Sequence, residues 1–187
     1  MIKEHKYKNE KYKSRINGLH TIQYNTWRSM KQRCNDKKLH ERYPSYTDCN
    51  ICEEWLDFQK FSEWFDKNYI EGYQLDKDLL FPKNKLYSPD TCCFIPQEIN
   101  VSIIKPYKKR ELPIGVYKHR NKYVAHIKEN KQSKYLGIFN TIEEAYDCYK
   151  VNKSKQLIEL ANKYKDKLTF KVYETLVNYN KNIDEFY

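Results

Sequence analysis

YQLDKDLLFPKNKLYSPDTCCFIPQEIN, residues 73–100, is the stretch of sequence that decides the fold of the central part of the chain. Apolar and charged residues alternate over residues 73–80, and a loop rich in Pro, Lys and Asn follows. A short apolar run then leads into residues that can open a helix. This order predicts a strand, a long loop, a second strand and the start of a helix. Side chains two apart in a strand share a face, so Asp76 and Asp78 are expected on one face and Lys77 on the other.

Dispersed positions around this stretch form a wider pattern, which runs from about residue 24 to residue 104. Its members are Trp27, Met30, Arg33, Cys34, Tyr46, Cys52, Trp55, Phe58, Phe61, Leu75, Asp76, Lys77, Asp78, Tyr87, Ser88, Pro89, Cys92 and Asn100. The pattern resembles that of the HNH (ββα-metal) endonucleases, and especially that of their phage relatives of the homing type. The resemblance implies a strand pair and a helix built around one divalent metal, Mg²⁺ or another, and hydrolysis of phosphodiester bonds in double-stranded DNA.

The resemblance also implies roles for single residues, with a catalytic set of Asp76, Lys77, Asp78 and Asn100. Asp76 and Asn100 fall on metal-binding positions and are expected to converge on the cation, with Asp78 nearby. Lys77 stands where the family has the His that activates water, and residues 41–118 contain no His. An ordinary Lys is protonated at neutral pH and cannot act as a general base unless its pKa falls by several units. Lys77 is therefore expected to contact phosphate or to stabilise the transition state.

Charge is distributed unevenly along the 187 residues, whose net charge is +10. Residues 1–40 carry 11 basic and 3 acidic side chains, residues 41–104 carry 6 and 12, and residues 105–165 carry 15 and 6. Two basic segments flanking an acidic centre suit contact with a polyanion on the flanks and binding of a divalent cation between them. A solvated lysine-rich surface is the other interpretation of the charge alone.

Composition limits the class of protein. The 29 aromatic residues supply enough core material for a folded chain despite the high charge. No apolar run approaches the roughly 20 residues that span a bilayer, and no signal peptide opens the chain. We therefore expect a cytoplasmic protein, in the cytoplasm of the bacterial host if a phage encodes it, with no membrane partner and no small-molecule cofactor. The oligomeric state is left open.

The six cysteines are expected to be reduced in such a compartment. Cys49 and Cys52 have the spacing of a zinc knuckle, and Cys92 and Cys93 could complete a set of four thiolates for a structural zinc ion. The alternative is simple burial, which the HNH-like pattern favours because Cys52 and Cys92 belong to it.

Two helices are predicted before the central stretch. Residues 21–33 have one apolar side, with Thr21 or Asn25 as a candidate cap. Residues 52–67 place five aromatic residues at spacings of three and four, which predicts an amphipathic helix that supports the strands. Near the end of the chain, residues 170–177 show helical spacing as well.

Beyond Pro113 the pattern changes. Residues 114–117, 122–127 and 134–139 are three short alternating runs separated by polar turns, and a capping box at Thr141 and Glu144 opens a helix. Three antiparallel strands backed by one helix are expected. The matching positions are Gly115, Val116, Lys122, Tyr123, Ala125, Ile127, Leu136, Gly137, Phe139, Thr141, Glu143, Glu144, Ala145 and Tyr149. They resemble the APETALA/ERF-type DNA-binding domain, which implies a sheet that lies in the major groove of DNA.

The resemblance sets Tyr123, Ala125 and Ile127 toward the helix, which leaves Lys122, Val124, His126 and Lys128 exposed. The predicted DNA contacts are Lys118, Arg120, Lys122, His126, Lys128 and Lys134. A single Lys is as well explained by solvation, whereas a set on one sheet face favours DNA. His126 is expected to contact phosphate or water rather than a metal.

The sequence thus predicts an α+β protein with five parts. These are a basic arm (1–20), an HNH-like module with flanking helices (21–104), a basic linker (105–112), an APETALA/ERF-like domain (113–165) and a helical tail (166–187). The expected function is metal-dependent DNA cleavage at sites that the C-terminal domain positions. The alternative is a DNA-binding protein without catalysis, such as a phage regulator or an anti-defence factor, because Lys77 replaces the His.

Overall fold

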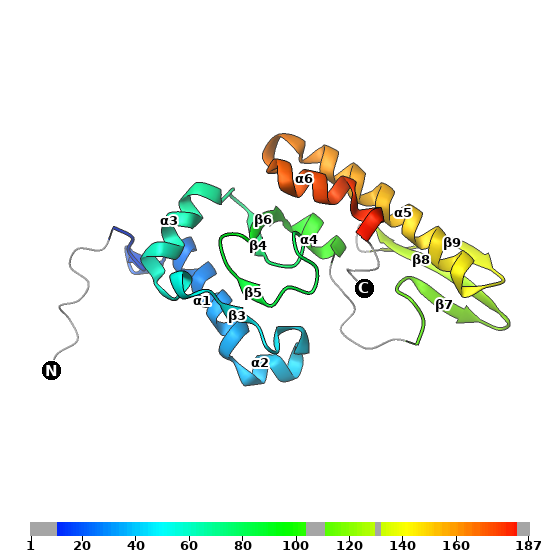
Figure 1. Cartoon of the computed structure of the whole chain (residues 1–187), viewed down its shortest axis with the longest axis horizontal. Helices are drawn as coiled ribbons and strands as arrows, with labels where there is room; N and C mark the ends of the chain where they lie inside the picture. The colour runs from blue at the N-terminus through cyan, green and yellow to red at the C-terminus, as the bar shows by residue number, and fades with distance from the viewer. Residues whose placement is uncertain (1–10, 104–110, 130–131, 183–187) are drawn as a thin grey trace. The chain divides into compact units, whose positions relative to one another are not determined.

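The computed structural model of the chain describes residues 11–103, 111–129 and 132–182. It divides into two compact units, of which the first comprises Met1–Lys77 and Asn84–Phe94 and the second Asp78–Lys83 and Ile95–Tyr187. Helices and strands occur in both (Figure 1), which confirms the predicted α+β class. The division falls within strand β6 (Cys93–Pro96), not in the predicted linker 105–112, most of which lies outside the described residues, as does half of the predicted arm 1–20.

The first unit is mainly helical, with short strands between its helices. In chain order its elements are β1 (Arg15–Ile16), β2 (Leu19–His20), α1 (Ile22–Asn35), α2 (Lys37–Arg42), η1 (Pro44–Tyr46), β3 (Asn50–Ile51), η2 (Glu53–Leu56), α3 (Phe58–Asn68), β4 (Tyr73–Asp76) and β5 (Leu86–Tyr87). Strand β3 pairs with β5 in parallel, and β4 pairs with β6. The predicted helix 21–33 is confirmed, and Thr21 caps it. The predicted helix 52–67 divides at Asp57, which ends one short 3-10 helix and caps α3.

Aromatic side chains form the core of the first unit, as the spacing of residues 52–67 predicted. Trp55, Phe61 and Phe65 are buried, and the indole of Trp27 in α1 donates a hydrogen bond of 2.8 Å to the carbonyl of Trp55. Trp55 meets Phe61 edge to face at 5.1 Å, a geometry that aromatic pairs favour. This core holds α1 against α3 and supports strand β4, whose Leu75 is buried in it.

Strand β4 ends at Asp76, four residues before the end of the predicted strand 73–80. The chain then passes through residues 77–85 without a strand, forms β5 and β6, and continues directly into α4 (Gln97–Ile103). The order of strand, loop, strand and helix expected for residues 73–100 is therefore present, with the additional short strand β5 between the two.

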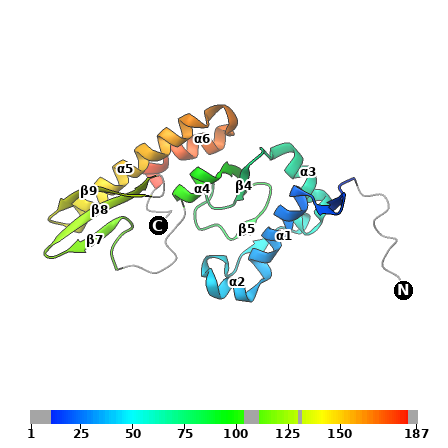
Figure 2. The same cartoon turned by 180° about the vertical axis from the view of Figure 1, so that it is seen from behind.

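The second unit consists of a sheet, a long helix and a shorter helix beside it. Its elements are α4, β7 (Val116–His119), β8 (Lys122–Glu129), β9 (Gln132–Phe139), α5 (Ile142–Lys163), η3 (Lys165–Lys167), α6 (Phe170–Val177) and η4 (Tyr179–Asn182). The three strands are antiparallel in the order β7-β8-β9, and α5 lies along one face of them in both views (Figure 1, Figure 2). The predicted three-stranded sheet with one helix is confirmed. Helix α6 lies in the predicted tail.

Small residues let α5 approach the sheet closely. Ala125 in β8 and Ala145 in α5 are fully buried, and Gly115 lies against the ring of Tyr149. The helix begins with the predicted capping box, because the Thr141 hydroxyl accepts from the backbone N–H of Glu144, whose carboxylate accepts from the N–H of Thr141. The capping box fixes the start of α5 at the end of β9, so α5 turns back over the sheet.

Lys153 is a buried charge on α5. Its Nζ donates to Oε1 of Gln156 at 2.8 Å, and Nε2 of Gln156 donates to the carbonyl of Lys128 at 2.8 Å, which connects α5 to β8. Burial lowers the pKa of Lys153 from its ordinary value to about 8. Lysine is rarely buried without a charged partner, so this residue costs stability whenever it is protonated.

None of the helices in the described part of the chain has the length and apolar character needed to cross a membrane.

The contact between Gly115 and Tyr149 makes a first prediction. Gly115 has φ +78°, and a Cβ there would lie 2.1 Å from Cδ2 of Tyr149. Gly115→Ala should therefore lower the unfolding free energy, measured by urea titration, by about 2–4 kcal/mol. Alanine disfavours the left-handed backbone, and its Cβ would clash with the Tyr149 ring. Gly72→Ala is the matched control, because Gly72 has φ +80° with no atom within 4 Å of its added Cβ. Equal losses in the two variants would show that α5 does not approach the sheet this closely.

Lys153 makes a second prediction, on pH. Below about pH 8 the ammonium is charged in the folded and unfolded chains alike, and its burial costs on the order of 3 kcal/mol. Between about pH 8 and 10.5 the unfolded chain binds the proton more strongly than the folded chain, so stability due to this group rises with pH. Lys153→Met should be more stable than the natural chain at pH 7, and its advantage should shrink by pH 10.

Urea midpoints measured across this range test the effect. Lys155→Met is the control, because Lys155 is exposed on the same helix. An advantage of Lys153→Met that is the same at pH 7 and pH 10 would contradict the assigned cause.

Candidate functional site

Lys77 is buried at the end of strand β4, with only 4% of its surface exposed. Its Nζ donates to the carbonyl of Asn84 at 2.7 Å, and Nδ2 of Asn84 donates back to the carbonyl of Lys77 at 3.0 Å. Nδ2 of Asn84 also donates to the carbonyl of Leu86 at 2.6 Å. These reciprocal bonds join the two ends of the 78–83 loop. The side chain that occupies the position of the family's His thus closes a loop, and its burial does not favour the predicted contact with phosphate.

Arg33 is the second cation in this region. Burial lowers the pKa of its guanidinium, but the phenols of Tyr87 and Tyr46 and the carboxylate of Asp76 raise it, and the net effect is upward. The guanidinium lies 5.7 Å from the ring centre of Tyr46, and the Nζ of Lys77 lies 5.7 Å from that of Tyr87. Two cations and two phenols thus surround the end of β4. Arg33 belongs to the HNH-like pattern, but the sequence suggested no role for it.

A cavity of about 270 Å³ opens beside Arg33, between α1 and α2. It is lined by Ser29, Gln32, Arg33, Leu39, Tyr43 and Tyr46. This cavity was not predicted, because its lining residues are spread over positions 29–46 and nothing in the sequence indicates that they converge.

The described cysteines of the first unit are not joined in disulfides. Burial raises the pKa of Cys34 to about 11, with a further contribution from the Cys49 thiol, and burial raises the pKa of Cys92 to about 12. Such thiols are protonated at neutral pH in the metal-free chain, and binding of zinc would release their protons. Within the described residues, no three His, Cys, Asp or Glu side chains are grouped closely enough to hold a metal ion.

The predicted zinc set of Cys49, Cys52, Cys92 and Cys93 stays a prediction. Three of the four, Cys49, Cys92 and Cys93, are buried, as the alternative interpretation expects.

The predicted metal ligands are half-buried. Asp76 is the last residue of β4 in the first unit, while Asp78 and Asn100 belong to the second unit, in the 78–83 loop and in α4. Their predicted convergence on one cation stays a prediction.

Helix α4, which carries Asn100, is held by a charged contact inside the second unit. Glu98 accepts from the Nζ of Lys163 at 2.6 Å and from the hydroxyl of Tyr164 at 2.8 Å. The hydrogen bond from Lys163 and that from Tyr164 lower the pKa of Glu98. The contact joins α4 to the end of α5, so the two helices form part of the same unit.

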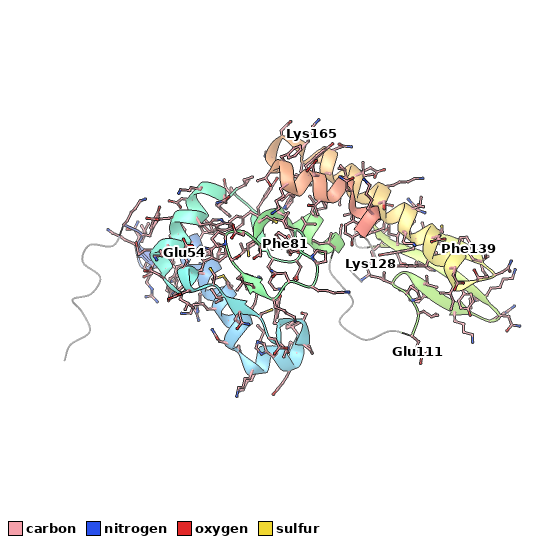
Figure 3. The ribbon with its side chains drawn as sticks, viewed as in Figure 1. Glu54, Phe81, Glu111, Lys128, Phe139 and Lys165 are labelled. Atoms are coloured by element: carbon pink, nitrogen blue, oxygen red, sulfur yellow. The ribbon has the colours of Figure 1, made fainter. Side chains whose placement is uncertain are left out.

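The sheet of the second unit offers a different kind of surface. Val116, Ala125 and Ile127 are buried under α5, which confirms that Ala125 and Ile127 face the helix. The residues of opposite parity therefore face away from α5. In the strand register these include Lys122 opposite His119, His126 opposite Tyr135 and Lys128 opposite Ser133. Figure 3 labels Lys128 in β8 and Phe139 in β9 of this sheet.

The six predicted DNA contacts do not all share that face. Lys122, His126 and Lys128 do, whereas Lys118 lies opposite Tyr123 and Lys134 opposite Ile127, both at positions of the other parity. Lys134 also forms a salt bridge of 3.0 Å with Glu129. Arg120 is in the turn between β7 and β8, with φ 53°. A bulge between Ala125 and His126 shifts the register, and this shift could not be read from the alternation of the sequence.

Aromatic residues on the outward face were not among the predicted contacts. The ring of His126 lies edge-on to Tyr117 at 5.6 Å and to Tyr135 at 5.7 Å. Nδ1 of His126 is 3.2 Å from the hydroxyl of Ser133. The alternation of residues 114–117 was the signal that could have found Tyr117. Tyr135 faces outward because of the bulge, which the alternation of residues 134–139 does not show.

The hydrogen bonds between Lys77 and Asn84 lead to a third prediction. Lys77→Ala should lower the unfolding free energy by about 2–3 kcal/mol, because a charged hydrogen bond is lost and the Asn84 carbonyl loses a donor. Lys67→Ala is the control, because Lys67 is exposed on α3 of the same unit. If Lys77→Ala unfolds at the same urea concentration as the natural chain, the hydrogen bonds between Lys77 and Asn84 do not stabilise the fold.

No protein-family model, no curated protein and no solved structure matches the chain.

Proposed function

We propose that this protein binds double-stranded DNA through the outward face of the β7-β8-β9 sheet. The observation that supports the proposal most directly is the common face of Lys122, His126 and Lys128, opposite the face that α5 covers. Two lysines and a histidine on one exposed sheet face can contact phosphates and base edges at the same time. A three-stranded sheet of this size fits the major groove, as it does in other proteins that read DNA with strands.

The charge of the sheet segment supports the same proposal. Residues 114–139 contain six basic side chains and one acidic side chain, Glu129. That acidic side chain is paired with Lys134, so it does not oppose a polyanion at the centre of the face. Neutralisation of phosphates by such cations releases counterions and gives most of the affinity for DNA.

Arg120 adds a further reason. It has a left-handed backbone in the turn between β7 and β8, a conformation that Asn or Gly adopts more readily than Arg. A residue that keeps an unfavourable backbone often has a functional role. We infer that Arg120 contacts the DNA backbone at the end of the sheet.

A second candidate function is metal-dependent DNA cleavage by the HNH-like part of the chain. It is favoured by the order of β4, β6 and α4, with Asp76 at the end of the first strand and Asn100 in the helix. Carboxylate and amide oxygens are ligands that Mg²⁺ accepts, so the chemistry of this donor pair fits a divalent cation. A cation held by such ligands would stabilise the charge on phosphorus and the leaving oxygen.

This chain's own residues limit what cleavage would require. The Nζ of Lys77 donates a hydrogen bond to the carbonyl of Asn84 and closes the loop, and an ordinary lysine does not act as a general base at neutral pH. The base would have to be a water molecule or a group outside the HNH-like pattern. For this reason DNA binding is the proposed function, and cleavage the second candidate.

The fourth prediction tests binding. The double variant Lys122→Ala/Lys128→Ala should weaken binding to a duplex at 50 mM salt, and the dependence of log affinity on log salt should become shallower by about two. Lys155→Ala/Lys167→Ala is the matched control, since it removes the same charge from exposed positions of α5 and η3. A similar loss in both double variants would mean that net charge alone holds the DNA.

Nicking of supercoiled plasmid with Mg²⁺ or Mn²⁺ separates the two candidate functions. Cleavage by the natural chain that Asp76→Ala abolishes, while duplex binding is retained, would establish the second function. A protein that only binds DNA shifts the plasmid in a gel and leaves it intact with either metal. Failure to bind any duplex would overturn the proposed function.

A further inference from the structure

The outward face of the sheet has an apolar centre. Tyr117, Val124 and Ile138 lie side by side across the three strands, because Tyr117 pairs with Val124 and Val124 pairs with Ile138. Tyr117 is 48% exposed and Ile138 is 46% exposed, although both are large apolar residues. We call these three residues the apolar row. Exposed apolar residues that are contiguous mark a surface that binds something.

An aromatic group borders the apolar row on one side. His126 follows Val124 by two positions in β8, and its ring contacts Tyr117 and Tyr135 edge-on. Tyr135 is 57% exposed. These contacts keep the tyrosine rings in place beside the row.

Cations border the apolar row along the strands. Lys122 precedes Val124 by two positions in β8, and Lys128 follows it by four, so both lie on the same face as the row. Both are exposed. An apolar centre flanked by cations matches a duplex, in which the phosphates lie outside the groove and the base edges lie within it.

We infer that the apolar row contacts the 5-methyl groups of thymines in the major groove, so that the sheet prefers A·T base pairs. The inference rests on the proposed function, since it names what the DNA-binding face reads. The thymine methyl is the one apolar group that a natural base presents in the major groove, and apolar side chains recognise it by contact. Residues that read guanine would be Arg or Lys, and those stand at the ends of the face and not at its centre.

The size of the row fits this ligand. Neighbouring strands lie about 4.8 Å apart, so three strands place the outer members of the row roughly 10 Å apart. The major groove is about 12 Å wide, which admits the row together with its side chains. Val124 and Ile138, two of the three members of the row, are branched aliphatic residues, which contact methyl groups well but offer no flat surface on which an unpaired base could stack. Tyr117 is the member of the row with a ring.

The test compares duplexes that differ only in the methyl group. Alternating poly(dA-dT) and alternating poly(dA-dU) have the same base pairs, and only the first has 5-methyl groups. Each buried methyl contributes roughly fourfold in affinity, so a row that contacts two of them should bind the thymine duplex at least about tenfold more tightly. Poly(dG-dC) and its 5-methylcytosine form give the converse comparison, in which the added methyl should strengthen binding.

Variants of the row connect the preference to these residues. Val124→Thr and Ile138→Thr keep β-branched side chains suited to a strand but add a hydroxyl, and each should reduce the ratio between the thymine and uracil duplexes. Val151→Thr is the matched control, since Val151 is exposed on α5, and it should leave the ratio unchanged.

Each outcome decides the inference. Equal affinity for the thymine and uracil duplexes overturns the inference and leaves duplex binding standing. Tighter binding to single-stranded oligo(dT) than to either duplex overturns it in favour of base stacking. No binding to any of these DNAs overturns the inference together with the proposed function, and points to a protein partner for the row. A preference for the thymine duplex that the row variants reduce and Val151→Thr retains supports it.

Discussion

The close approach of helix α5 to the sheet is the constraint on which the second unit depends. Gly115 leaves room for the ring of Tyr149, and the fully buried Ala125 and Ala145 keep the two layers near each other. A helix that covers one face of a three-stranded sheet leaves the other face to solvent. The alternation of the strands then decides which side chains a ligand can meet, so the packing on the inside determines the chemistry on the outside.

The outward face combines features that would be unfavourable without a ligand. Its centre exposes apolar and aromatic residues to water, and Arg120 in the adjoining turn keeps a left-handed backbone. On the covered side, Lys153 is buried, and among the described residues its Nζ donates a hydrogen bond to the uncharged side chain of Gln156. Unfavourable features of this kind are found where a surface has a function. More of them lie on the outward face than on the covered side.

In the first unit, the HNH-like pattern divides into core positions and a lysine that closes a loop. Many of its positions are core residues, such as Trp55 and Phe61, which pack in the same cluster as Leu75 of β4. Lys77 turns inward, and its side chain donates a hydrogen bond to the carbonyl of Asn84. The Asn84 side chain donates back to the carbonyl of Lys77, so the pair closes the 78–83 loop. The scaffold and the chemistry of the pattern are thus separable, because packing requires shape and catalysis requires a particular proton acceptor.

The sequence by itself determined the elements with strong local signals. The capping box at Thr141 and Glu144 predicted the start of α5, and the alternation of residues 122–127 predicted that β8 has two distinct faces, of which the APETALA/ERF-type resemblance named the one toward the helix. Both signals are local, because a cap or an alternating strand depends on neighbouring residues only. Only the tertiary structure decided the burial of Lys77, the pairing of Lys134 with Glu129 and the alignment of Tyr117, Val124 and Ile138. Those features depend on partners from other strands and on a bulge in the register, and a pattern read along one chain does not contain them.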